Sequence, residues 1–258
     1  MKSATVLLAL GLCAACGGAP GATDDGAVEG STQQALSNKD FDVDFANCAE
    51  FVGIGLVPAQ NAQPFVPAGY TLVNVGTQAM VVVRITKCAS AVIDGKAVQE
   101  TLTSQIGITL QGPDGTADLN NYTVAYGTNQ PLLHARLQAA GLNADNTHDL
   151  SLSLVGGALS AAAGSPHSSS FAVSGSAAPP PGPPTTFVAS WWANGVHGAV
   201  RSRTVFPAIN FNFGASTSLT TAPDTTLAAL IGGTTLTFPA LDSYNTFAAS
   251  HLEVRDTD

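Results

Sequence analysis

The sequence predicts a mainly β protein: a single antiparallel β-barrel, closed or strongly curved, with two short helices. About a dozen short runs either alternate apolar with polar residues or are apolar throughout, which are the patterns of half-buried and buried strands. Glycine and proline separate these runs, with 26 and 15 residues respectively in a chain of 258. Many short strands punctuated by turns, with little helical periodicity, favour a barrel over a helical or an α/β fold.

The first predicted strands surround two cysteines, Cys48 and Cys88. The runs that predict strands in this half are residues 40–45, 51–57, 70–75, 80–85, 91–93, 96–98, 106–110 and 122–126. Asp94 and Gly95 lie between two of these runs and tolerate the positive φ of a tight hairpin turn. The alternating aspartates of 40–45 do not form a calcium loop, because no glycine or distal glutamate follows in register. They therefore predict a solvated strand face.

Two stretches predict helices. In residues 131–140, Pro131 suits the first turn, Leu133 and Leu137 lie on one stripe, and Gly141 suits the left-handed stop. Residues 225–231 form a second, shorter helix that ends at Gly232-Gly233.

The second half of the chain continues with short strands. They are predicted at residues 149–155, 171–173, 187–192, 198–206, 209–213, 217–220, 236–238 and 251–254, with Asn194-Gly195 as a hairpin turn. The segment 177–184 holds five prolines and is extended and semi-rigid. It either forms a long loop of one domain, residues 39–258, or separates two domains near residue 180. We favour one domain, because no second cysteine pair follows the prolines.

The N-terminus has the pattern of an export signal. Lys2 precedes a small apolar stretch that is too short to span a bilayer as a helix, so we expect a signal peptide over 1–15. Small residues before Cys16 resemble a bacterial lipobox, which predicts lipidation of Cys16 and a flexible tether over 16–38. The alternative is an ordinary secretory signal. We therefore expect the bacterial cell envelope, lipid-anchored in the outer membrane, or secretion, with membrane contact through the lipid anchor only.

Export also explains the remaining cysteines. If the signal peptide removes Cys13 and a lipid occupies Cys16, Cys48 and Cys88 are the remaining pair. An even pair in an oxidising compartment predicts a disulfide rather than a metal or catalytic site. Such a bond contributes roughly 4 kcal/mol in the chain-entropy model.

Composition excludes one class of partner and leaves few chemical motifs. The chain has 9 basic and 18 acidic residues, so we expect no nucleic-acid partner. It carries no nucleophile elbow, zinc-protease motif, P-loop or Cys-x-x-Cys, and Gly53-Ile54-Gly55 lacks the third glycine of a dinucleotide site. The five histidines are scattered singly. We therefore expect no metal and no cofactor, and the catalytic residues, if any, are unknown.

Six residues are candidates for binding a ligand. Arg84 interrupts the apolar run 81–85 and needs a partner if it is buried. Because the disulfide would draw residues 48 and 88 together, Glu50 is predicted to pair with Arg84, with Glu100 as the other possible partner. Tyr122 adds a polar group on a neighbouring strand.

The block 191–203 supplies the other candidates. Trp191 and Trp192 must point to opposite faces of a strand. Arg201 and Arg203 share one face: inside the barrel they would bind a carboxylate or phosphate group, and outside it they would solvate the surface. We favour the outer face for the arginines and keep Trp192 as a candidate contact.

One stretch resembles a known family. A turn, then Phe65-Val66-Pro67-Ala68-Gly69-Tyr70, then Met80-Val81-Val82-Val83-Arg84, resembles the opening of acetoacetate decarboxylase-like barrels. The resemblance implies a cone-shaped β-barrel. That family's decarboxylases form a Schiff base on a lysine beside a second lysine. Once processed, this chain would have Lys39, Lys87 and Lys96, none adjacent to another, so the decarboxylase chemistry is not expected.

These observations leave three hypotheses. The first is an exported lipoprotein whose barrel binds a small, largely apolar molecule. The second is a barrel-type lyase, isomerase or cyclase acting on a keto or polyketide-like substrate. The third is a surface protein that acts by contact alone.

Overall fold

The computed structural model describes residues 39–164, 170–180, 182–195 and 198–257. The predicted signal peptide, Cys16 and tether lie outside these residues, as do His167 and His197. In the described part of the chain, no helix has the length and apolar character needed to cross a membrane.

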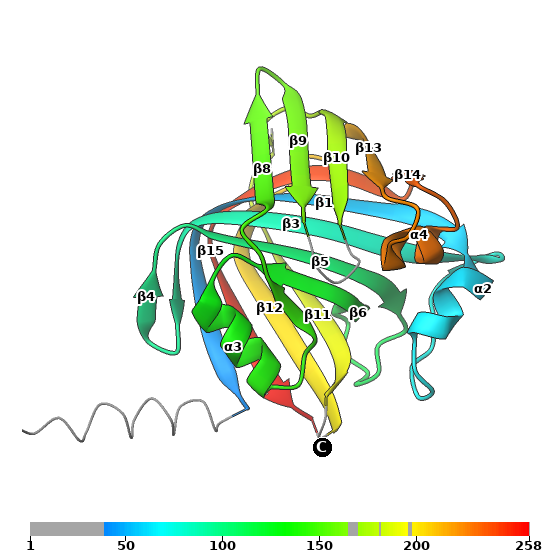
Figure 1. Ribbon diagram of the computed structural model, residues 1–258. Helices are drawn as coiled ribbons and strands as arrows, with labels where there is room; N and C mark the ends of the chain where they lie inside the picture. Colours follow the sequence, from blue (N-terminus) through cyan, green and yellow to red (C-terminus); the bar gives the residue numbers. More distant parts are fainter. Residues whose placement is uncertain (1–38, 165–169, 181, 196–197, 258) are drawn as a thin grey trace, which may run out of the picture. The chain divides into compact units, whose positions relative to one another are not determined.

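Seven strands close into a barrel (Figure 1). They are β1 (Phe41–Pro58), β3 (Gln78–Ile93), β5 (Thr101–Leu110), β6 (Leu119–Thr128), β11 (Thr185–Gly195), β12 (Gly198–Asn210) and β15 (Leu241–Asp256). Their order around the barrel is β1-β15-β12-β11-β6-β5-β3, and β3 pairs back with β1. The predicted closed barrel is confirmed.

The prediction of an antiparallel barrel is wrong at one seam. Residues 189–192 of β11 run parallel to residues 119–122 of β6, so the barrel is mixed. Between β6 and β11 the chain leaves the barrel and later re-enters it, so that β11 runs in the same direction as β6.

The excursion forms part of a second sheet, which the single-barrel prediction also missed. It consists of β14 (Thr235–Thr237), β13 (Ser216–Thr221), β10 (Phe171–Ser176), β9 (Ala158–Ala163) and β8 (Leu150–Val155), in that order. Its apolar face packs on the outer faces of β1, β3 and β5, and glycines of β1 permit close approach. A Cβ on Gly53 would lie 2.5 Å from the Phe238 ring.

Three α-helices are present among the described residues instead of the two predicted. They are α2 (Ala59–Ala62), α3 (Pro131–Ala139) and α4 (Thr226–Ile231), and the 3₁₀ turn η1 (Gln63–Phe65) follows α2. The predicted helix signals act as expected in α4: the Thr225 side chain accepts from the Ala228 N–H, and Gly232 takes a left-handed φ of 72°. The sequence had indicated only a turn where α2 lies.

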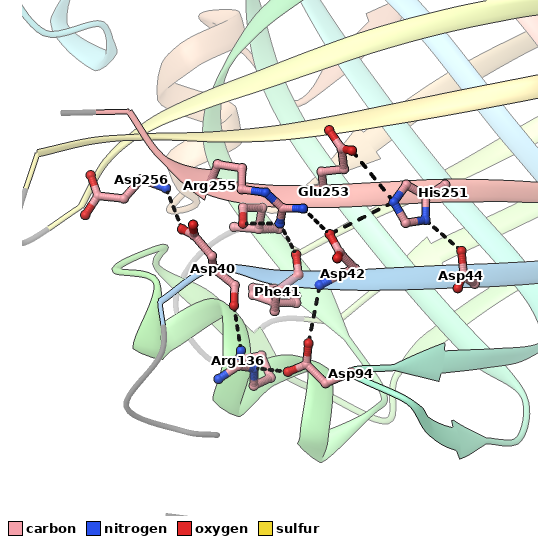
Figure 2. Close-up of polar contacts among 11 residues, drawn as sticks. Asp40, Phe41, Asp42, Asp44, Asp94, Arg136, His251, Glu253, Arg255 and Asp256 are labelled. Carbon is pink, nitrogen blue, oxygen red and sulfur yellow. Dashed lines mark hydrogen bonds and ion pairs between the residues drawn. The ribbon is translucent and has the colours of Figure 1, made fainter. Parts of the chain in front are cut away.

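Helix α3 closes one end of the barrel core. Leu133 and Leu137 are fully buried in a cluster with residues that include Phe41 and Phe206. Arg136 fixes the helix to the barrel: its Nε lies 2.6 Å from Asp94 Oδ2, and it also donates to the Asp40 carbonyl (Figure 2).

Short strands complete the sheets: β2 (Asn74–Val75), β4 (Lys96–Val98) and β7 (Ala144–Asn146). The Asp94-Gly95 turn between β3 and β4 is confirmed, with φ of 47° and 75°. The β11–β12 hairpin is also present, but Gly195 pairs with Gly198, so Asn194-Gly195 ends a strand rather than forming the turn.

Candidate functional site

The predicted disulfide is confirmed and sets the register of the site. Cys48 and Cys88 are direct partners on β1 and β3, with their Cα atoms 4.0 Å apart. The same register places Glu50 opposite Thr86 and Val52 opposite Arg84. Side chains alternate between the two faces of a strand, so residues an even number of positions from the cysteines share their face. Glu50, Val52 and Arg84 therefore point into the barrel.

A small cavity of about 50 Å³ lies inside the barrel beside these residues. Six of the seven barrel strands contribute to it. Its apolar wall consists of Val52, Val82, Leu119, Phe187, Ala189, Trp191, Phe206, Phe211 and Leu241. Glu50, Arg84, Asn121 and Asn245 supply the polar part of the lining. The space holds only a few non-hydrogen atoms.

The predicted Glu50–Arg84 pair is confirmed. Arg84 Nε lies 2.5 Å from Glu50 Oε2, and the side chains are 12% and 4% exposed. Thr86 Oγ1 also donates to Glu50 Oε2 at 3.1 Å, and Asn245 Nδ2 lies 3.3 Å from Oε1. These donors satisfy a carboxylate that would be costly to bury alone.

Arg84 is held on its other side by a neutral group. Its Nη1 donates to Gln105 Oε1 at 2.7 Å, and the guanidinium lies 5.5 Å from the centre of the Phe206 ring. Because one carboxylate faces one guanidinium, the polar end of the cavity has no net charge.

Tyr126 borders the same cluster but does not offer a base. Burial raises the pKa of Tyr126 to about 12, although the positive charge of Arg84 and a hydrogen bond with Thr103 oppose the rise. The phenol therefore stays protonated throughout the physiological range.

The structure places the other four candidates outside the cavity. Arg201 lies 5.8 Å from the Trp192 ring centre and pairs with Asp114 at 2.8 Å. Arg203 pairs with Asp118 at 2.9 Å. The favoured outer-face position of the arginines is thus observed.

Tyr122 and Trp192 belong to an aromatic group on this outer face. The Tyr122 ring centre lies 5.3 Å from that of Tyr70, which in turn lies 6.4 Å from Trp192. Trp192 Nε1 donates to Asn120 Oδ1 at 2.7 Å. Burial raises the pKa of Tyr122, against a hydrogen bond from the Asn194 backbone. Tyr122 also lines a broader cleft of about 390 Å³, where β6 and β11 diverge.

Charge pairing also fixes Asp114. Burial acts to raise its pKa, but hydrogen bonds from Thr116 and the adjacent Arg201 outweigh it, so the pKa lies below its ordinary value. The arginines on this face are therefore engaged with carboxylates of the chain itself.

The three lysines of the described chain lie away from the cavity. Lys39 pairs with Asp256 and Lys87 with Glu100, both in largely solvated positions, and Lys96 is exposed on β4. Glu100, the alternative partner considered for Arg84, thus pairs with Lys87 instead. Among the residues that the structure describes, no lysine lines the cavity where it could form a Schiff base.

A second charged group lies on the outside of β1 and β15 (Figure 2). His251 Nδ1 lies 2.7 Å from Asp44 Oδ1, and Arg255 Nη2 lies 2.5 Å from Asp42 Oδ1. The aspartates of β1 are solvated, as predicted, and are paired across to β15. Across the described ranges, no group of three or more potential metal ligands converges.

Sequence reasoning missed three uncharged members of the cavity cluster: Gln105, Asn121 and Asn245. Each occupies an inward position of an alternating strand, and each is nearly or fully buried. Gln105 and Asn121 lie at the polar positions of their strands, whose apolar residues face outward, so the alternation in the sequence gives no signal for them.

Solved structures share this architecture. An acetoacetate decarboxylase-like enzyme from Sphingomonas wittichii RW1 aligns over 85% of this chain and 92% of that chain, with a TM-score of 0.53 and 10% identity. An acetoacetate decarboxylase from Legionella pneumophila subsp. pneumophila str. Philadelphia 1 aligns over 81% and 84%, with a TM-score of 0.50 and 11% identity.

A further acetoacetate decarboxylase structure aligns over 83% of this chain and 88% of that chain, with a TM-score of 0.52 and 8% identity. No protein-family model and no curated protein matches the chain. The resemblance to acetoacetate decarboxylase-like barrels is therefore confirmed at the level of the fold.

Proposed function

We propose that this protein is an exported bacterial lipoprotein whose barrel binds a small, largely apolar molecule in its interior. The observation that carries the proposal is the cavity itself: an apolar wall around Trp191, with one end closed by the paired charges of Glu50 and Arg84. A concave apolar site with a few convergent polar groups is typical of ligand binding.

Binding fits this lining better than catalysis does. The ionisable groups that line the cavity, within the described ranges, are Glu50 and Arg84, and they neutralise one another. A lyase, isomerase or cyclase needs a group free to accept or donate a proton in contact with its substrate. Here the carboxylate already accepts hydrogen bonds from Arg84, Thr86 and Asn245.

The two tryptophans provide a test of binding. Trp191 lines the cavity, whereas the Trp192 indole is hydrogen-bonded to Asn120 outside it. In a ¹⁵N-labelled protein, small apolar molecules should shift the Trp191 indole N–H signal and leave that of Trp192 in place.

A cavity-filling variant gives the matched control. Ala189→Leu adds bulk to the cavity wall and should abolish the shift, whereas Ala172→Leu, on the exposed face of β10, should not. If no small molecule moves the Trp191 signal, or if Ala189→Leu binds as well as wild type, the binding proposal fails. Action by surface contact would then be the better hypothesis.

Export and anchoring rest on the sequence before residue 17, and the disulfide fits an oxidising compartment. Cells fed a labelled fatty acid should incorporate it into the wild-type protein and not into Cys16→Ala. Equal labelling of both proteins would contradict lipidation, and secretion after ordinary signal cleavage would remain.

A further inference from the structure

Asn245 lies at the polar end of the cavity with an unused hydrogen-bond acceptor. It is fully buried on β15, where it is the direct register partner of Glu50 on β1. Its Nδ2 is directed to Glu50 Oε1 at 3.3 Å. No hydrogen-bond donor of the described chain reaches its Oδ1.

The orientation of this amide follows from its neighbour. Rotating the amide by half a turn would place Oδ1 against the Glu50 carboxylate, where two acceptors would face each other. The carboxylate therefore holds Nδ2 on its own side and leaves Oδ1 as the free acceptor. Buried acceptors in proteins nearly always have a donor, so this oxygen indicates what a ligand must bring.

We propose that the ligand carries a neutral O–H or N–H group that donates to Asn245 Oδ1, and that it belongs to the class of small alcohols or amides. This inference rests on the proposed binding function and specifies its substrate class. The apolar body of the ligand packs against Trp191 and Val82 on the wall of the same cavity.

The charges of the cluster select against ionised ligands. Glu50 and Arg84 already neutralise each other at 2.5 Å, so an added carboxylate or ammonium would enter a small buried space without a counter-ion. A ketone of equal size fits the space but lacks the donor that Asn245 requires.

Two probes of the same size test the inference: 2-butanol, which has a hydroxyl donor, and butanone, which has none. Both are titrated into the millimolar range, because ligands with so few non-hydrogen atoms have little surface with which to bind. The Trp191 indole N–H reports binding, and Trp192 is the internal reference. One additional neutral hydrogen bond predicts that 2-butanol binds about tenfold more tightly than butanone.

Two variants show whether Asn245 is responsible. Asn245→Leu removes the acceptor and should reduce the alcohol-to-ketone ratio to about one. The matched control is Asn210→Leu: the Asn210 Oδ1 is also buried without a partner, but Asn210 does not line the cavity. This variant should keep the wild-type ratio. The wild-type comparison remains decisive if Asn245→Leu does not fold.

The outcomes separate the two proposals. Equal binding of 2-butanol and butanone to the wild-type protein would overturn the donor inference and leave the binding function standing. Tighter binding of butyrate than of 2-butanol would also overturn it. If none of these probes moves the Trp191 signal, the proposed function fails together with the inference.

Discussion

Replacing Arg84 by methionine while keeping Glu50 is expected to lower the free energy of unfolding by about 3–5 kcal/mol. The Glu50 side chain is only 4% exposed, so the variant would bury a carboxylate without its counter-ion. Methionine retains much of the aliphatic volume of arginine, so the loss reports the charge rather than a large cavity. Gln105 would also lose its donor.

The double variant Glu50→Gln/Arg84→Met separates the charge from the packing. With both charges removed, the loss should fall to about 1–2 kcal/mol, because a neutral amide can share hydrogen bonds with Thr86 and Asn245. The two single substitutions are therefore strongly non-additive. The free energies come from urea unfolding followed by tryptophan fluorescence, with the disulfide intact.

The control is an exposed ion pair whose basic residue, Lys87, lies on the same strand as Arg84. Lys87 lies 2.8 Å from Glu100, but the side chains are 42% and 57% exposed. Lys87→Met should cost no more than about 1 kcal/mol. If Arg84→Met costs as little as Lys87→Met, or if the double variant is no more stable than Arg84→Met, the cavity charges are solvated and the reasoning is wrong.

Three further results are expected. Non-reducing mass spectrometry should find Cys48 joined to Cys88, and replacing both by alanine should lower the free energy of unfolding by roughly 4 kcal/mol. Two free thiols at these positions in the non-reduced protein would contradict this. Gly107→Ala places a methyl group 2.5 Å from the Trp191 ring, so it should lower the free energy of unfolding by about 1–3 kcal/mol and weaken probe binding. An unchanged free energy in urea unfolding, together with unchanged probe affinity, would rule out the close contact. Burial raises the pKa of Asp242 above 3.8, although hydrogen bonds from Thr217 oppose the rise. The folded state therefore holds the proton to a higher pH than the unfolded state does. As a result, the free energy of unfolding falls as the pH rises from 3.8 through the folded-state pKa. Asp242→Asn should lack this part of the pH dependence of the unfolding midpoint, and an unaltered profile would refute the assignment.

The cavity pair was predictable because a covalent bond supplied the register. Once Cys48 and Cys88 are placed opposite each other, counting two and four residues along the strands brings Glu50 and Arg84 to adjacent rungs. A charge inside an apolar run is also conspicuous. Asn245 had neither advantage: it carries no charge, and it lies 195 residues from Glu50, with no local signal of their pairing.

The parallel seam and the second sheet were beyond the sequence for a related reason. The short strands β8, β9 and β10 have the same alternation as barrel strands, so their period does not show which sheet they join. The pairing between β10 and β13 spans the whole β11–β12 hairpin. Long-range pairings of this kind depend on packing against β1, β3 and β5 rather than on local propensity.

The closure between β1 and β15 also determines when the barrel can fold. Phe41 pairs with Val254, so the strand that begins the barrel has one of its two neighbours at the far end of the described chain. During synthesis, β1 can pair with β3 early, but its other edge stays open until β15 is available. Folding dominated by such distant contacts is slow, typically milliseconds to seconds. Deleting β15 would therefore leave β1 and β12 as exposed edges prone to aggregation.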